Sequence, residues 1–160
     1  LLGGSFADGQ TGAIAGAGGT ILFTANGGLT WENASLLSDP DARLNAVFFA
    51  SDRLGWAVGA DGAVFTSIGS GRKWRRRFTG VSADLNDVYF SDPRTGWAVG
   101  DKGTIIATTN GGSTWSEEDS HVKHRLEKLA SNGKGVWAVG FGGTILNYDP
   151  AGAAGPGIRP

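Results

Sequence analysis

A repeated tetrapeptide constrains the fold of this chain more than any other feature. The sequence Trp-Ala-Val-Gly occurs at residues 56–59, 97–100 and 137–140, at steps of 41 and 40 residues. A fainter version, Gly-Ala-Ile-Ala-Gly, occupies residues 12–16. Repeats of this period are typical of solenoids, propellers and other repeat arrays. We therefore expect four units, which begin near residues 1, 44, 85 and 126.

Each unit is predicted to consist of short β-strands. In the third unit, apolar and β-branched runs bounded by Gly, Asp, Asn and Pro cover residues 85–90, 96–100, 104–108 and 114–117. Helical spacing persists for about two turns at most, the best example being residues 121–129. Four strands in a repeat of this length predict a four-stranded antiparallel propeller blade. A β-solenoid is the competing architecture, but its coils are usually shorter.

The fold class predicted from this pattern is all-β, a β-propeller with about four blades in residues 1–150. The fourth unit stops after its third strand, so we expect it to lack an outer strand. Residues 151–160 are rich in Gly, Ala and Pro and are expected to form a tail. Four blades would make a partial ring or half of a ring. Open end blades leave apolar faces exposed, so self-association of two chains into an eight-bladed ring is a further expectation.

Composition excludes several classes of protein. Fourteen Lys and Arg residues balance fifteen Asp and Glu, and the net charge of −1 argues against a nucleic-acid binder. The absence of cysteine excludes disulfides, thiolate zinc sites and a cysteine nucleophile. The longest uncharged stretch, between Asp8 and Glu32, is too polar and too rich in glycine for a membrane span. The chain lacks an initial Met and a signal-peptide pattern, so we expect a mature or excised piece of a longer product.

A second motif closes the first and third units. Both copies fit the Asp-box pattern Ser/Thr-x-Asp/Asn-x-Gly-x-Thr-Trp, whereas the second unit has lost the Asn and the second Thr. The expected role is structural: the Asn accepts hydrogen bonds from backbone N–H groups two residues on, Gly supplies a positive φ, and Trp covers the turn. The residues of the two complete boxes are Thr24, Asn26, Gly28, Thr30 and Trp31, and Thr108, Asn110, Gly112, Thr114 and Trp115.

Together, the Gly-Trp-Ala-Val-Gly, Gly-Thr-Ile and Asn-Gly-Gly-x-Thr-Trp motifs resemble the repeats of the photosystem II stability/assembly factor family. The resemblance covers residues 6–149, nearly the whole chain. It implies a seven-bladed propeller that binds partner proteins without catalysis or a cofactor. It also implies export to the periplasm, the thylakoid lumen or the extracellular space. In photosynthetic organisms it would mean a chaperone for the precursor of a reaction-centre subunit.

Basic residues gather in one segment of the second unit, around Trp74. Its five members are Arg72, Lys73, Arg75, Arg76 and Arg77. On a strand, Lys73, Arg75 and Arg77 point to one side, and Arg72, Trp74 and Arg76 to the other. One interpretation is a charged edge strand that discourages aggregation. The other is a patch for an acidic protein segment or an anionic head group, because the guanidinium fork binds carboxylates in a bidentate manner.

The same segment adjoins the loops in which propellers usually bind partners. By repeat position, these loops cover residues 16–19, 59–62, 100–103 and 140–143. The segments between blades cover residues 32–43, 75–84 and 116–125, and Arg75–Arg77 are expected to begin one of them.

Catalytic and metal sites are not expected. His121 and His124 have the spacing of two metal ligands on a helical turn, but a solvated connection between blades is favoured. Asp39 and Asp41 are the carboxylates that turn chemistry explains least. An Asp-box also occurs in sialidases, xyloglucanases and sortilin-like receptors. The alternative function is therefore a fragment of an Asp-box glycoside hydrolase whose catalytic residues lie elsewhere. A purely structural repeat segment of a larger extracellular protein is the third possibility.

Overall fold

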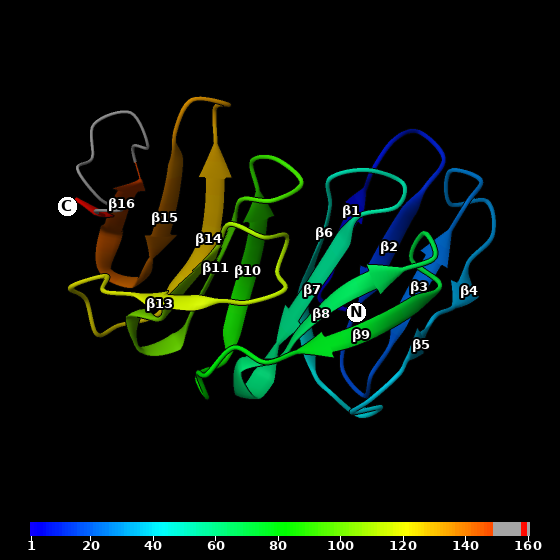
Figure 1. The fold of residues 1–160 in the computed structure, drawn as a ribbon, viewed down its shortest axis with the longest axis horizontal. Coiled ribbons are helices and arrows are strands. Elements are labelled where there is room, and N and C mark those ends of the chain that lie inside the picture. The colour runs from blue at the N-terminus through cyan, green and yellow to red at the C-terminus, as the bar shows by residue number, and fades with distance from the viewer. Residues whose placement is uncertain (149–157, 160) are drawn as a thin grey trace.

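The computed structural model describes residues 1–148 and 158–159, and it confirms the all-β propeller architecture. Four small sheets stand side by side as blades, from blade 1 at one end of the molecule to blade 4 at the other (Figure 1). Within each blade, successive strands pair in antiparallel order from the innermost to the outermost.

The strands of blades 1 and 2 follow the predicted pattern with one addition. Blade 1 comprises β1 (Gly3–Phe6), β2 (Gly12–Ala15), β3 (Ile21–Thr24) and β4 (Glu32–Asn33). Blade 2 comprises β6 (Leu44–Phe49), β7 (Gly55–Gly59), β8 (Val64–Ile68) and β9 (Lys73–Arg77). The addition is β5 (Ser35–Leu36), which lies in the connection between these blades and pairs in parallel with β9.

Blades 3 and 4 repeat the arrangement. Blade 3 comprises β10 (Leu85–Phe90), β11 (Gly96–Gly100), β12 (Ile105–Thr108) and β13 (Ser116–Glu118). Blade 4 comprises β14 (Leu126–Ser131), β15 (Val136–Gly140), β16 (Thr144–Tyr148) and β17 (Ile158–Arg159). Short 3₁₀ turns, η1 (Ala60–Gly62), η2 (Asp101–Gly103) and η3 (Phe141–Gly143), join the second and third strands of blades 2, 3 and 4.

Blade 4 differs from the sequence-based expectation at its outer edge. It was expected to lack an outer strand, but β17 pairs with β16 through Tyr148↔Ile158 and Asn147↔Arg159. These two residues belong to the segment that composition assigns to a tail, and the rest of that segment lies outside the described residues. The prediction failed because the strand is only two residues long, too short for an alternating pattern to be visible.

The innermost strands hold the blades in register. Strand β1 contacts β6, β6 contacts β10, and β10 contacts β14. Asn45 Nδ2 donates to the Leu85 carbonyl oxygen of the following blade at 2.8 Å, and Asn86 Nδ2 donates to that of Leu126 at 2.9 Å. Each of these blades has a β-bulge at this point, where the register shifts by one residue. The bulge turns carbonyl groups towards the neighbouring blade, where an amide side chain reaches them.

The final Gly of the tetrapeptide is required by close backbone approach. A Cβ added at Gly59 or Gly100 would lie 1.9 or 2.0 Å from the carbonyl oxygen of the residue that precedes the innermost strand. That oxygen belongs to Arg43 in blade 2 and to Asp84 in blade 3. The recurrence of this Gly in blades 2, 3 and 4 thus accompanies the bulge at the start of the innermost strand in each of them.

Three apolar clusters fill the spaces between blades. The first joins blades 1 and 2, the second blades 2 and 3, and the third blades 3 and 4. Trp56 stacks on Phe90 in the second cluster, with ring centroids 3.4 Å apart and planes at 10°. Trp97 occupies the equivalent place in the third cluster, whereas Trp137, on blade 4, is only half-buried. The tryptophans of blades 2 and 3 therefore pack between neighbouring blades, as the repeat predicts.

Candidate functional site

The basic segment lies on the outermost strand of blade 2. Arg72 precedes β9, and the other four basic residues belong to it. Arg75–Arg77 do not begin a between-blade segment as expected, because they pair in register with Thr66, Phe65 and Val64. Strand β8 is long enough to continue the ladder to Arg77, so the connection between blades begins only at Phe78.

Part of the edge of β9 is covered by backbone. The N–H of Ser35 donates to the Arg72 carbonyl oxygen, and that of Leu37 to the Trp74 carbonyl oxygen, both at 2.9 Å. Strand β5 therefore prevents further strand pairing at this half of the edge. From the sequence, the charged side chains alone were expected to have that role.

Trp74 and two of the five basic residues lie on the side of the segment that faces blade 1. Trp74 is fully buried in the first cluster and meets Phe49 edge-on, with ring centroids 5.8 Å apart. The Arg72 guanidinium lies over the Phe23 ring, 4.6 Å from its centroid. Arg76 forms an ion pair with Asp39 of the connection between the blades. Arg72 thus contacts blade 1, Arg76 contacts the connection that follows it, and Asp39 has a structural partner.

The opposite side of β9 carries the remaining positive charge. Lys73 and Arg75 are exposed, and within the described part of the chain neither side chain has a hydrogen bond or an ion pair. Arg77 is half-buried and its Nε donates to Thr66 Oγ1 at 3.0 Å. The charged surface available to a partner is therefore narrower than the five basic residues suggest.

An open groove of about 450 Å³ adjoins this surface at the end of blade 2. Residues 76–81 form one wall, and Asp61 and Gly62 of η1 form the other. Phe78 stands on its rim with 88% of its surface exposed. An exposed aromatic ring beside arginines suits a peptide that carries both apolar and acidic side chains.

Blade 3 has the equivalent groove with the opposite charge. It measures about 370 Å³ and is lined by residues 117–120 together with Lys102, Gly103, Thr104 and Val122. The repeat of 41 residues places Glu117 and Glu118 where blade 2 has Arg76 and Arg77. Burial raises the pKa of Glu118. This reversal of charge is visible when the second and third units are aligned. The sequence-based prediction missed it because it considered only the basic segment of the second unit.

The two complete Asp-boxes have the same hydrogen bonds. In blade 1, Thr24 Oγ1 accepts from the N–H groups of Asn26 and Gly28 at 3.3 and 2.9 Å. Asn26 Oδ1 accepts from the Thr30 N–H at 3.0 Å, and its Nδ2 donates to Thr30 Oγ1 at 2.8 Å. The Asn was expected to accept from a backbone N–H two residues on, but the Thr hydroxyl makes that contact. It does so because it reaches the turn from the end of the third strand.

Blade 3 reproduces each of these contacts. Thr108 Oγ1 accepts from Asn110 and Gly112, and Asn110 Oδ1 accepts from Thr114. The tryptophan that follows each turn meets a phenylalanine of the innermost strand edge-on. The pairs are Phe6 with Trp31 at 6.0 Å and Phe90 with Trp115 at 5.9 Å. Blade 2, whose box is incomplete, keeps the corresponding pair, Phe49 with Trp74.

The two histidines have different partners. His121 Nδ1 lies 3.1 Å from Asp119 Oδ2, and His124 Nε2 contacts Thr144 Oγ1. Among residues 1–148 and 158–159, the structure brings no three His, Asp or Glu side chains together as metal ligands.

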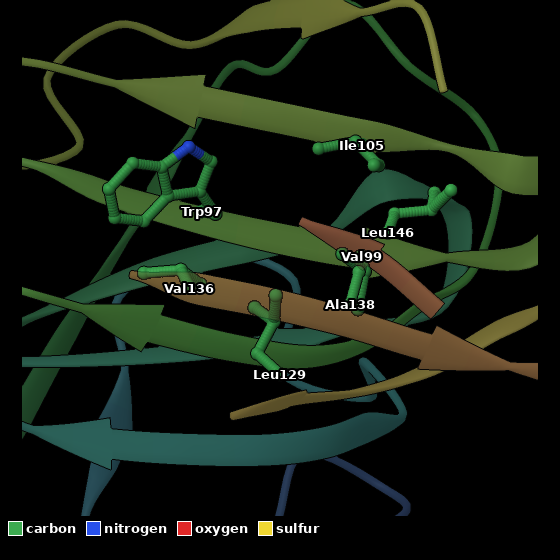
Figure 2. Close-up of a pocket in the computed structure, with 7 residues that line it drawn as sticks. All are labelled: Trp97, Val99, Ile105, Leu129, Val136, Ala138 and Leu146. Carbon is green, nitrogen blue, oxygen red and sulfur yellow. The ribbon is translucent and has the colours of Figure 1, made fainter. Parts of the chain in front are cut away.

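The remaining polar candidates are dispersed. Asp41 is exposed. A sialidase uses a tyrosine as its nucleophile, but Tyr89 packs edge-on against Phe48 with ring centroids 5.2 Å apart, and the side chain of Tyr148 lies outside the described part. A cavity between blades 3 and 4 is lined by Trp97, Val99, Ile105, Leu129, Val136, Ala138 and Leu146 (Figure 2). Its volume of about 10 Å³ is that of a gap in an apolar core and leaves no room for a ligand.

In the part of the chain that is described, no helix has the length and apolar character to cross a membrane.

The sequence matches a known protein family. The family model described as photosynthesis system II assembly factor YCF48 matches residues 1–79 and 71–155. The chain belongs to the YCF48 family. No curated protein sequence matches it.

Solved structures of the YCF48 family share the fold. One, described as YCF48 bound to D1 peptide, has a TM-score of 0.75 and 23% identity over 98% of this chain and 53% of its own. YCF48 from Cyanidioschyzon merolae has a TM-score of 0.74 and 22% identity over 100% of this chain and 56% of its own. The chain thus spans about half the length of these YCF48 structures.

More distant structures have similar blades. The computationally designed Ika4 protein matches with a TM-score of 0.71 and 16% identity, over 92% of this chain and 89% of its own. An ancestral GH74 enzyme matches with a TM-score of 0.68 and 16% identity, over 98% of this chain and 25% of its own. At these identities, the likeness to the GH74 enzyme extends to the fold alone.

Proposed function

We propose that this chain is a protein-binding module of the YCF48 family that recognises an acidic segment of its partner. The observation that carries the proposal is the free positive charge of Lys73 and Arg75 on the side of β9 that faces away from blade 1. Arg77, on the same side of the strand, lines the groove at residues 76–81. Carboxylates bind guanidinium groups in charge-assisted pairs, so this face suits Asp and Glu side chains. The peptide-bound YCF48 structure supports peptide recognition as a property of the family.

The test uses a fluorescent D1 peptide and a short glutamate-rich peptide as probes. Replacement of Lys73, Arg75 and Arg77 together with Ala is expected to weaken binding about tenfold, which corresponds to about 1.4 kcal/mol. Added salt should weaken binding to the natural chain more than to the variant. The matched control is Lys102→Ala with Lys134→Ala, two exposed lysines of other blades. Unchanged affinity of the triple variant, at unchanged thermal stability, would refute this docking face.

The proposed activity is binding without catalysis. Two side chains that could serve a glycosidase have structural partners instead: the Asp39 carboxylate pairs with Arg76, and Tyr89, the type of residue that a sialidase uses as nucleophile, packs on Phe48. Incubation with a fluorogenic glycoside is expected to release no product above the uncatalysed rate. Release abolished by replacement of a single carboxylate would contradict the proposal.

We also propose that the protein acts in an exported compartment, the periplasm or the thylakoid lumen, on the ground of its family. Fractionation of source cells should place it there, and its recovery with cytoplasmic markers would contradict the assignment.

Self-association is the last part of the proposed function. Both end blades expose apolar side chains, with Leu1 and Leu2 exposed at 70% and 59% on one and Phe141 and Ile145 at 71% and 61% on the other. Burial of such faces favours association of two copies. Sedimentation of the chain should give twice the monomer mass of 16.5 kDa, and a single monomeric species would rule the association out.

A further inference from the structure

Each blade has a forward face, which points towards the next blade along the chain, and a backward face, which points towards the preceding blade. The forward face of one blade packs against the backward face of the next. The interface between blades 2 and 3 shows the complete set of contacts. Trp56, on the forward face of blade 2, stacks on Phe90, on the backward face of blade 3. The Trp56 Nε1–H also donates to the Gly111 carbonyl oxygen in the Asp-box turn of blade 3, at 3.0 Å.

The other two interfaces each lack one member of the Trp–Phe pair. At the first, Phe49 of blade 2 faces blade 1, which has Ala13 at the tryptophan position. At the third, Trp97 of blade 3 faces blade 4, which has Ser131 at the phenylalanine position. Of the three interfaces between blades in the part of the chain that the structure describes, only the one between blades 2 and 3 therefore has both rings.

The two open ends carry the missing partners. The forward face of blade 4 presents Trp137, only half-buried, and Ile145, which is 61% exposed. Ile105 occupies the position of Ile145 in blade 3 and is 2% exposed, so packing against a following blade accounts for the difference. The backward face of blade 1 presents Phe6 at 48% exposure, whereas Phe90 is exposed at 3%.

The backward face of blade 1 is already shaped like that of blade 3. Phe6 stands edge-on to Trp31, as Phe90 does to Trp115. The N–H of Gly27 donates to the Gln10 carbonyl oxygen at 2.8 Å, as the N–H of Gly111 does to that of Arg94. The Gly27 carbonyl oxygen therefore occupies the position that accepts the indole N–H at the interface between blades 2 and 3.

We propose that Trp137 of one copy stacks on Phe6 of a second copy and donates its indole N–H to the Gly27 carbonyl oxygen there. This inference rests on the proposed self-association and specifies its geometry. A forward face fits a backward face, so the contact is heterologous, and two copies related by a two-fold axis make it twice. The product is a closed ring of eight blades, within the size range of known propellers.

Sedimentation velocity of three variants tests the pairing. Trp137→Arg and Phe6→Arg, which place an unpaired charge at the contact, are each expected to convert the dimer to monomer. Phe78→Arg is the control, because Phe78 is 88% exposed on blade 2, away from both end faces. It should leave the dimer intact. Far-ultraviolet circular dichroism and the midpoint of urea unfolding of each variant report whether the monomer remains folded.

A mixture of the two disruptive variants distinguishes this geometry from a symmetric end-to-end contact. Trp137→Arg retains the Phe6 face, and Phe6→Arg retains the Trp137 face, so the mixture should form a heterodimer with one natural interface. A dimer that survives in Trp137→Arg would overturn the pairing and leave self-association standing. The natural chain is also sedimented at up to about 100 times the peptide concentration used in the binding test. If it remains a monomer there, both the pairing of Trp137 with Phe6 and the self-association are overturned.

Discussion

Single side chains set how closely the first two strands of each blade approach. In three blades, a phenylalanine of the innermost strand lies over a glycine of the second strand. An added Cβ at Gly12, Gly55 or Gly96 would lie 2.7, 2.8 or 2.5 Å from the ring. Blade 4 replaces both members of the pair, with Ser131 opposite Val136. Ser131 is smaller than the phenylalanine of the other blades, and Val136 is larger than their glycine. The two changes compensate in volume, as close packing requires.

We expect Gly96→Ala to lower the free energy of unfolding by about 1–3 kcal/mol, because the new methyl group overlaps the Phe90 ring. Urea unfolding followed by tryptophan fluorescence measures the change. Gly9→Ala is the matched control, because an added Cβ at Gly9 meets no atom within 4 Å. Equal stabilities of the two variants would show that Phe90 moves aside without cost.

Asp87 makes the stability of the fold depend on pH. Burial raises its pKa above 3.8, against the opposing effects of the Leu129 N–H hydrogen bond and the charge of Lys128. An acid whose pKa is higher in the folded state binds more protons there, so stability falls as the pH rises from its unfolded pKa through its folded pKa. Asp87→Asn should therefore gain stability relative to the natural chain over that window.

The measurement is the free energy of unfolding of both chains between about pH 3 and about pH 7. Asp92→Asn serves as the comparison. The Arg94 N–H hydrogen bond lowers the pKa of Asp92, so its stabilisation is lost as the pH falls, and the difference has the opposite sign. Parallel profiles for the natural chain and Asp87→Asn would contradict the assignment.

The turns between the third and fourth strands share one hydrogen bond even where the Asp-box is incomplete. The N–H of Gly28, Gly71 or Gly112 donates to a hydroxyl of Thr24, Ser67 or Thr108 at 2.9, 2.8 and 3.0 Å, respectively. The Asn is absent from the second box, yet its turn closes. The hydroxyl at the end of the third strand is therefore the common element of the motif, and the Asn adds to it.

We expect Thr108→Val to cost about 1–3 kcal/mol, because it leaves the buried N–H of Gly112 without an acceptor. The neighbouring Thr109→Val removes an exposed hydroxyl of the same size. That control should change stability by less than about 0.5 kcal/mol. Thermal unfolding monitored by circular dichroism compares the two, and equal midpoints would show that the hydroxyl is dispensable.

The molecule as a whole behaves as a linear array of blades, each of which contacts its chain neighbours. Among the described residues, blades 2 and 3 are covered on both faces, whereas blades 1 and 4 are each covered on one. In such an array, stability depends on each interface that forms, so closure into a ring adds stability that a single chain lacks.

Closure through a second copy predicts that the melting temperature rises with protein concentration. A tenfold increase in concentration adds about 1.4 kcal/mol to the free energy of dissociation and unfolding per mole of dimer. Differential scanning calorimetry over a range of concentrations measures this shift, and the Trp137→Arg variant should show none. A melting temperature independent of concentration for the natural chain would contradict closure.

The blade architecture is readable from sequence because its causes are local. Strand runs, turn residues and the tetrapeptide recur at a constant step, so the all-β class and the four blades follow from periodicity and turn chemistry. The repeat also predicts burial of its tryptophans between blades, because identical units stacked in series bury identical faces.

The state of the basic segment depends on contacts between residues distant in sequence. The pairing of β5 with β9, the ion pair of Arg76 with Asp39 and the position of Arg72 over Phe23 all join blade 2 to the chain before it. Their formation requires the blades to be docked, and no local pattern encodes that. Periodicity therefore determined which residues form blades, whereas docking of the blades decided which charges remain free for a partner.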